Sequence, residues 1–374
     1  MSASSPLMGE IKRGAFMKIL DWYIIKKFLG TFVLSMVLII LIVVVFDISE
    51  KIDDFLQKEA PLKAIIVDYY FNFIPYIINL FSPLFTFIAL ILFTSKMASR
   101  TEIVAILSSG VSYTRLLYPY LLSATVIAGL SLYLNNYVIP RATKKRIAFE
   151  DIYIRDAFRN LDRNIHKQES PGNYIYLERY SVEENTGYKF SIEKFKEGKL
   201  YYKLMAETIK WDSIRSRWTI NNYFTRTING MKETIKKGMK LDTTLAFTPE
   251  EFGRKDNTME TMDTPELTRY IAAEQLKGSD HIEVLLIEKY RRNSFPFATF
   301  ILTLIGVSIA SRKIRGGIGM HIGIGIFISF TFIMFMQVST TFAAGGLLSP
   351  LVAVWIPNVI FSFLAWFLLK KAQK

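Results

Sequence analysis

Runs of residues without a charge constrain this chain more than any other feature of its sequence. Four of them extend over Phe28 to Phe46, Tyr69 to Ser95, Leu116 to Pro140 and Asn293 to Ser311. A fifth run, Gly316 to Leu369, is long enough for two helices and has turn residues near its middle. Because a helix rises about 1.5 Å per residue, roughly 20 apolar residues cross a bilayer. The sequence therefore predicts six membrane spans.

Basic residues beside the spans predict on which side of the membrane each end lies. They follow or precede spans one, two, four and six and include Lys26, Arg100, Arg312 and Lys370. Cytoplasmic flanks carry an excess of Lys and Arg, so both termini are predicted to be cytoplasmic, whereas long domains escape this rule. We divide the chain into an extension or expression remnant at 1–16, spans one to three at 17–140, an outside domain at 141–292 and spans four to six at 293–374.

The outside segment has the pattern of an all-β domain. Apolar and polar residues alternate from Tyr174 to Glu178 and from Lys189 to Glu193, and turn sequences such as Asn229-Gly230 separate such stretches. Short strands at this spacing predict an antiparallel sandwich or jelly roll. Two helices are predicted to close the domain, one from Thr264 to Gly278 and one from His281.

A short stretch between spans two and three, Ser99 to Gly110, has the pattern of a helix at the cytoplasmic membrane face. Ser99 and Glu102 are three residues apart, as in a capping box, and Gly110 supplies the stop because glycine readily adopts the left-handed conformation. The apolar residues that recur at helical spacing are Ile103, Ile106 and Leu107. They predict one apolar stripe over about three turns. A passive interfacial helix and a docking site for a partner both fit this pattern.

Composition excludes several classes of function. The chain has no cysteine, and its three histidines lack the spacing of metal ligands. It contains no phosphate-binding loop of the form GxxxxGK(S/T), and neither HExxH nor GxSxG. We therefore predict no catalytic residue, no metal and no cofactor. The net charge of +13 fits cytoplasmic flanks and anionic lipids better than nucleic acid, because the mean hydropathy is +0.25.

Without a nucleotide site, such a membrane protein is driven by an ion gradient, driven by a separate ATPase, or not a transporter. A proton-coupled carrier needs an acid within the spans, and the candidates, Asp47 and Asp68, both lie at an edge. A signal transducer would sense a ligand with the outside domain and relay it through the cytoplasmic helix. A hydrophobic channel through the β domain and a lipid-sized cavity between spans one and five would favour transport over signalling.

Several stretches together have the pattern of a known family. The segment from Ser99 to Ser112 is followed by a span that ends at Val138-Ile139-Pro140. The other matching stretches are Leu20 to Tyr23, Pro75 and Pro83, Arg312 to Gly319, and Ile356 to Asn358. In this order, over nearly all of the chain from Met17, the sequence resembles the lipopolysaccharide export ABC permeases of the LptF/LptG type.

The resemblance implies a permease subunit of a bacterial inner membrane that extracts lipopolysaccharide or a related glycolipid. It implies a six-span α-helical bundle, with three spans on each side of a periplasmic β-jelly-roll domain that passes lipid to a periplasmic bridge protein. The partners implied are a cytoplasmic ABC ATPase dimer and a second permease subunit, either a paralogue or a copy. In such permeases the helix between spans two and three docks into a groove of the ATPase. Spans one and five line a lateral gate between the two permease subunits, which opens to the membrane lipids.

The resemblance also assigns roles to residues of this chain. Docking would involve Arg100, Glu102, Ile103, Ile106, Leu107 and Gly110, with Glu102 as the polar contact. The lateral gate and lipid path would involve Leu34, Leu38, Val45 and Lys51 on span one and Gly319, Gly323 and Phe327 on span five. The spacing of Gly319 and Gly323 fits ordinary packing within the bundle as well as a gate or subunit contact.

The chain departs from the family at the outer end of span one. Family members of one type carry basic residues there, suited to lipid phosphates. This chain instead has Asp47, Glu50, Lys51, Asp53 and Asp54. The acidic rim predicts that Lys51 and the basic cluster of the outside domain compensate, or that the cargo carries fewer phosphates.

Overall fold

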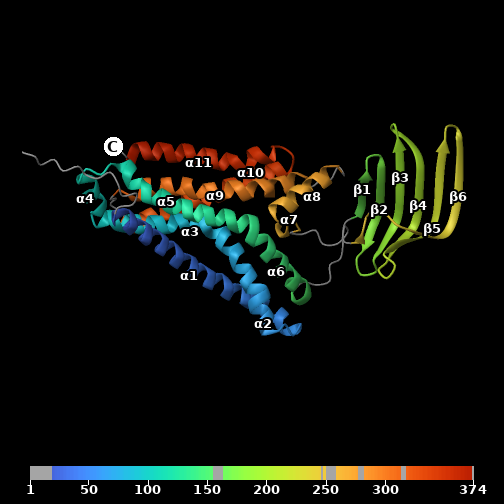
Figure 1. The fold of residues 1–374 in the computed structure, drawn as a ribbon, viewed down its shortest axis with the longest axis horizontal. Helices are drawn as coiled ribbons and strands as arrows, with labels where there is room; N and C mark the ends of the chain where they lie inside the picture. Colours follow the sequence, from blue (N-terminus) through green and yellow to red (C-terminus); the bar gives the residue numbers. More distant parts are fainter. Residues whose placement is uncertain are drawn as a thin grey trace, which may run out of the picture.

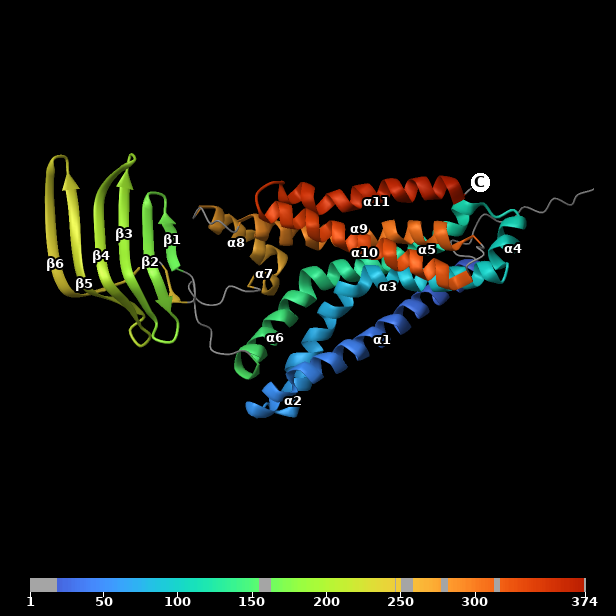
Figure 2. The same cartoon turned by 180° about the vertical axis from the view of Figure 1, so that it is seen from behind.

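The computed structural model describes residues 19–154, 163–245, 247–249, 258–276, 282–312 and 317–372. The molecule is elongated, with a helical bundle at one end and a β-sheet at the other (Figures 1 and 2). The predicted extension at 1–16, the predicted helix end at Gly278 and the helix start at His281 lie outside the described residues.

Six helical segments of the described chain are long and apolar enough to cross a membrane, which confirms the predicted spans. Span one is α1 (Ile19–Gln57). Span two joins α2 (Leu62–Ala64), the π-helical segment η1 (Ile65–Tyr70) and α3 (Phe71–Ser99). Span three joins α5 (Tyr113–Tyr133), the π-helical segment η2 (Leu134–Val138) and α6 (Ile139–Tyr153). Spans four to six are α9 (Ile282–Ala310), α10 (Gly317–Ala344) and α11 (Pro350–Ala372). The short helix α4 (Glu102–Ser108) follows span two, and α7 (Thr258–Thr261) and α8 (Thr264–Leu276) precede span four.

Several helices continue beyond the uncharged runs that predicted them. α1 extends past Phe46 to Gln57, and α6 carries span three to Tyr153 through the basic stretch that begins at Arg141. Lys, Arg and Glu are good helix formers, so the loss of apolar character does not end a helix. The helices therefore project out of the apolar layer toward the sheet.

The inserted domain contains one six-stranded antiparallel sheet, which confirms the predicted all-β insertion between two groups of three spans. Its strands are β1 (Arg163–Ser170), β2 (Asn173–Ser181), β3 (Thr186–Lys196), β4 (Lys199–Asp212), β5 (Arg217–Asn229) and β6 (Lys232–Thr243). Each strand pairs with its neighbours in the sequence, so the order is a meander, simpler than the crossing connections that define a jelly roll. Strand β1 lies nearest the helices and β6 farthest from them (Figures 1 and 2).

Apolar side chains from several strands form a core on the sheet. Leu177 of β2 and Trp218 of β5 are fully buried, and Trp218 donates its indole N–H to the carbonyl oxygen of Phe247 at 2.9 Å. A buried indole N–H needs such an acceptor. Phe247, four residues after the end of β6, is thereby held against the sheet.

In the helical bundle, α3 and α9 are central and α1 and α10 are peripheral. A Cβ on Gly306 of α9 would lie 2.6 Å from Leu90 Cδ2 and 2.8 Å from Phe87 Cε2 of α3, so a larger residue here would have to displace these side chains. In the most apolar part of each span, the share of residues that are buried is 61% in span two and 67% in span four. The corresponding share is only 17% in α1 and 22% in α10. Spans one and five are therefore the least covered of the six.

Candidate functional site

The helix between spans two and three begins at Glu102 instead of Ser99. α3 itself continues through Ser99, whose hydroxyl donates to the Lys96 carbonyl oxygen at 2.9 Å. The predicted capping box is therefore wrong, because its first residue belongs to the preceding helix. Thr101, with φ of +61°, makes the sharp turn into α4. The seven residues of α4 form about two turns instead of three.

The apolar stripe of α4 packs on the bundle. Ile103 is 1% exposed within the bundle core, and Ile106 and Leu107 are half-buried against that core. Val104, in contrast, is 58% exposed. Gly110 ends the segment with φ of +88°, as predicted. The part of α4 open to a partner is therefore the side that carries Val104, not the predicted stripe.

Two side-chain contacts join the region around α4 to the first turns of α1. The Tyr23 hydroxyl donates to Glu102 Oε2 at 3.3 Å. Arg115, in the first turn of α5, donates to Asp21 Oδ1 at 2.8 Å and to Oδ2 at 2.5 Å. Asp21 is 2% exposed. A movement of α4 and of the start of α5 therefore acts directly on α1.

Arg100, the remaining residue predicted for docking, is exposed in the turn before α4. Glu102 is half-buried because Tyr23 covers one of its carboxylate oxygens. Ser112 accepts the Arg115 backbone N–H at 3.3 Å and caps α5, which places the Arg115 side chain beside α1. The structure thus brings Arg100, Glu102 and the α1 contacts together around α4. Helix α4 lies at the end of the bundle away from the sheet (Figure 1).

The apolar residues predicted for the gate lie on uncovered faces. Leu34, Leu38 and Val45 of α1 and Phe327 of α10 are each more than half exposed. Gly319 and Gly323 of α10 are exposed as well, and among the described residues nothing lies within 4 Å of a Cβ placed on either. The GxxxG face of span five therefore does not pack within this bundle.

Lys51, the basic residue predicted to meet a lipid phosphate, is engaged within the chain. Its ammonium donates to Asp47 Oδ1 at 2.5 Å and to the Tyr69 hydroxyl. Tyr70 donates to the other oxygen of Asp47 at 3.1 Å. Glu50 and Asp53 remain exposed beside this cluster. The outer end of α1 therefore presents acid, and its one lysine before Gln57 is already paired.

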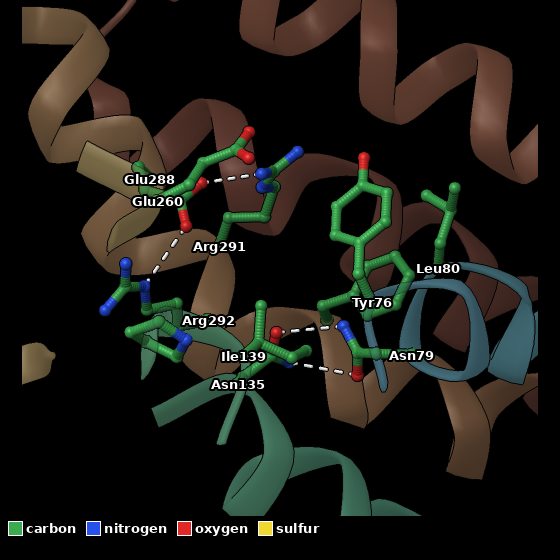
Figure 3. Close-up of a pocket in the computed structure, with 11 residues that line it drawn as sticks. Tyr76, Asn79, Leu80, Asn135, Ile139, Glu260, Glu288, Arg291 and Arg292 are labelled. Carbon is green, nitrogen blue, oxygen red and sulfur yellow. Dashed lines mark hydrogen bonds and ion pairs between the residues drawn. The ribbon is translucent and has the colours of Figure 1, made fainter. Parts of the chain in front are cut away.

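A polar cavity of about 70 Å³ lies where α9 approaches α7 and spans two and three (Figure 3). Glu288 accepts from Arg291 at 2.6 Å and from Arg292 at 3.1 Å. Arg292 also donates to the carbonyl oxygens of Met262 and Met259, which fixes α7 to α9. Burial, together with the nearby charge of Glu288, raises the pKa of Glu260, which lines the same cavity.

On the opposite wall of this cavity, Asn79 of α3 donates to Asn135 of η2 at 2.9 Å (Figure 3). Asn79 also accepts from Ser131 at 2.7 Å, which ties spans two and three together. The cavity thus lies between α6, which leads to the sheet, and α7, which returns from it. The hydrogen bonds around it join α3 to η2 and α7 to α9.

Sequence reasoning missed the contact between Asp21 and Arg115. The two residues are 94 positions apart, so no local pattern indicates their pairing. The engagement of Lys51 did have a signal, because Asp47 and Lys51 are four residues apart on one helix, a spacing that favours an ion pair.

The family model described as lipopolysaccharide export system permease LptF/LptG matches residues 22–371, nearly the whole chain. The match includes α4, the sheet and all six spans, and it confirms the resemblance found in the sequence. No curated protein matches the chain.

Proposed function

The chain belongs to the lipopolysaccharide export permease family LptF/LptG, and on that basis we propose that it extracts lipopolysaccharide or a related glycolipid from the inner membrane for a periplasmic bridge protein. Membership makes it a multi-pass inner membrane transport subunit. A separate cytoplasmic ABC ATPase dimer supplies the energy. The basic flanks support cytoplasmic termini and a periplasmic sheet.

The contacts around α4 are the observation that carries this proposal. α4 lies at one end of the bundle, with Val104 and Arg100 open to a partner and with Glu102 half-exposed. Behind it, Tyr23 and Asp21 of α1 contact Glu102 and Arg115. An ATPase that moves α4 therefore moves span one, which carries the proposed gate residues.

The low burial of α1 and α10 supports a second permease subunit. Each presents an uncovered apolar face, and large apolar patches of this kind are contact sites for lipid or protein. Gly319 and Gly323 suit a closely packed helix of the partner, because small residues let helix backbones approach in lipid. Spans one and five of the two subunits then enclose the lipid path.

The charges at the outer end of α1 limit which glycolipids the chain can bind as cargo. Lys51 is paired with Asp47, and exposed Glu50 and Asp53 repel anions. The cargo is therefore a glycolipid whose phosphates are few or are bound by the partner subunit.

The two other functions suggested by the sequence have less support. A proton-coupled carrier would use Asp47, but Lys51 and two tyrosines already bind this carboxylate. A signal transducer would also use α4, yet it does not account for the uncovered faces of α1 and α10. Family membership favours transport over both.

Replacing Glu102 with lysine is expected to weaken ATPase binding about 5- to 150-fold, equivalent to about 1–3 kcal/mol, because it sets a like charge against the group that faced the carboxylate. Glu102→Gln removes the charge without adding an opposite one, so it should reduce the ATPase affinity less than Glu102→Lys does. Affinity is measured with the purified permease and ATPase, and lipid release in reconstituted vesicles.

Tyr23→Phe serves as the matched control, since it removes the hydrogen bond to Glu102 and leaves the carboxylate in place. Its ATPase affinity should stay within about twofold of the wild type. Unchanged binding and release in Glu102→Lys would rule out the docking role.

Strand β6 is the proposed contact for the periplasmic bridge protein, because it is the exposed sheet edge farthest from the helices (Figure 1). A photo-crosslinker at Met239, which is 82% exposed on β6, should capture the bridge protein several-fold more than one at Gln168 on β1. Equal capture from both edges, or capture from β1 alone, would contradict this assignment.

A further inference from the structure

A groove of about 780 Å³ is lined by residues of α9 and α11, whereas the proposed gate residues lie on α1 and α10. Its walls are mainly aromatic and include Phe297, Phe300, Trp355, Phe363 and Trp366. The ring centroids of Phe297 and Trp355 are 5.2 Å apart. Phe297, Phe363 and Trp366 are each about half exposed or more, so the groove is open to the hydrocarbon around the bundle.

The groove is about as long as one leaflet of a bilayer is thick. On α11 its wall runs from Trp355 to Trp366, and a rise of about 1.5 Å per residue makes this about 16 Å. Half of a hydrocarbon core about 30 Å thick is about 15 Å. One acyl chain therefore fits along the groove. Because lipid tails are as apolar as these walls, the walls themselves do not select one lipid over another.

Positive charge gathers at one end of the groove. The Lys370 ammonium lies 3.9 Å from the ring centroid of Trp366, within the range of a cation–π interaction. Lys371 is exposed beside it, and Arg312, just after α9, donates to the Lys371 carbonyl oxygen. This end of α11 lies away from the sheet (Figure 1). The contact with Trp366 thus holds one cation where the groove ends, and two more lie at the same end of the helix.

The sequence provides no acid to neutralise this end of the groove. From Asn293 to Lys374 the chain contains neither Asp nor Glu, so α10 and α11 carry no carboxylate side chain. Toward the other end the cations are already paired, because Arg291 and Arg292 of α9 both donate to Glu288. Unpaired positive charge therefore lies at the Lys370 end, which faces the cytoplasm in the orientation proposed above.

We propose that the groove binds an anionic glycerophospholipid, with one acyl chain between α9 and α11 and its phosphate against Lys370 and Lys371. Basic pockets between membrane helices on the cytoplasmic side suit such headgroups. A zwitterionic phospholipid fills the same apolar walls, but its headgroup carries a cation of its own, which the two lysines repel. This lipid is a structural partner of the permease and not its cargo. The site goes beyond the proposed function and depends on it only for the choice of leaflet.

The tryptophans of the groove serve as reporters in the test. Of the five tryptophans in the chain, Trp211 and Trp218 lie on strands of the sheet. Trp22→Phe therefore leaves Trp355 and Trp366 as the tryptophans of the spans. The full chain with this change is reconstituted in vesicles that mix a phosphatidylcholine brominated on its acyl chains with unbrominated phosphatidylglycerol. Bromine quenches the tryptophans that it contacts, so the relief of quenching by phosphatidylglycerol gives the relative affinity of the groove for the two lipids.

The groove should prefer phosphatidylglycerol about tenfold, which is the order expected when one or two basic side chains meet one more net negative charge. The double variant Lys370→Gln/Lys371→Gln should lower this preference to about twofold or less. Lys26→Gln is the matched control, since it removes an exposed lysine of α1 that is also predicted to be cytoplasmic, and it should keep the tenfold preference.

Equal affinities for the two lipids, or a preference that survives in the double variant, would overturn the proposal. Absence of quenching by the brominated lipid would also overturn it, because it would show that protein and not lipid covers the groove. Both lysines are exposed, so their replacement leaves the packing of the bundle intact. No ATPase is used, so a negative result here is distinct from a failure of the Glu102 experiment.

Discussion

Replacing Asp21 with alanine is expected to destabilise the folded chain by about 2–4 kcal/mol and to reduce the lipid released per ATP hydrolysed. Breaking a buried ion pair by removing one partner typically costs about 3–5 kcal/mol, because the other charge is left alone. Asp21 is 2% exposed, but the Arg115 side chain is 34% exposed. Water therefore solvates part of the Arg115 charge once Asp21 is removed. The expected loss of folding stability is accordingly smaller than the range of about 3–5 kcal/mol for a fully buried pair.

Thermal unfolding of the purified chain in detergent measures the stability, and reconstituted vesicles with the ATPase measure the coupling. The double variant Asp21→Ala/Arg115→Ala should lose less stability than the sum of the two single variants, because each removes the same contact. Lys26→Ala changes an exposed charge on the same helix and should alter neither quantity. Strictly additive losses in the double variant would show that the pair does not interact.

Two glycines on α10 should respond in opposite ways to leucine. A Cβ on Gly325 would overlap the Ile91 side chain of α3, whereas Gly323 has open space around it. Gly325→Leu is expected to cost about 2–4 kcal/mol, because overpacking alone costs about 1–3 kcal/mol for smaller additions. Gly323→Leu should leave the stability of the single subunit within about 1 kcal/mol, since leucine also favours the helix.

Association with the proposed second subunit is expected to show the reverse order. Gly323→Leu should weaken association of the two permease subunits at least tenfold, because its side chain enters the face proposed for the partner helix. Thermal unfolding of the single subunit and the dissociation constant of the subunit pair are the two measurements. If Gly323→Leu lost as much single-subunit stability as Gly325→Leu and kept its partner, the assignment of the two faces would be wrong.

The sequence was sufficient for the spans and the inserted β domain, because charge-free length and alternation follow directly from the solvent that each segment meets. It was insufficient for α4. A Ser and a Glu three residues apart form a capping box only where a helix begins, and here α3 had not yet ended at Ser99. The apolar stripe of Ile103 was recognised, but a stripe fits a partner's groove and the chain's own core equally well.

Side-chain contacts between distant segments were also beyond the sequence. Asp21 and Arg115 meet because spans one and three pack side by side. No local sequence pattern predicts which spans are neighbours in the bundle. In the same way, the spacing of Gly319 and Gly323 predicted close helix packing, but on α10 it is Gly325, two residues further on, that lies against Ile91 of α3.

Span three has a mechanical consequence. It runs as a continuous helical segment of 41 residues from Tyr113 to Tyr153, or about 60 Å, from the end of α4 to the connection that enters the sheet. A rigid rod of that length converts a tilt of about 5° at Arg115 into a displacement of about 5 Å at its far end. The regular hydrogen bonding changes at the π-helical segment η2 and at Pro119 within α5, and these are the places where span three would bend. Span three is thus a lever, which would turn a small tilt at its α4 end into a large displacement at Tyr153.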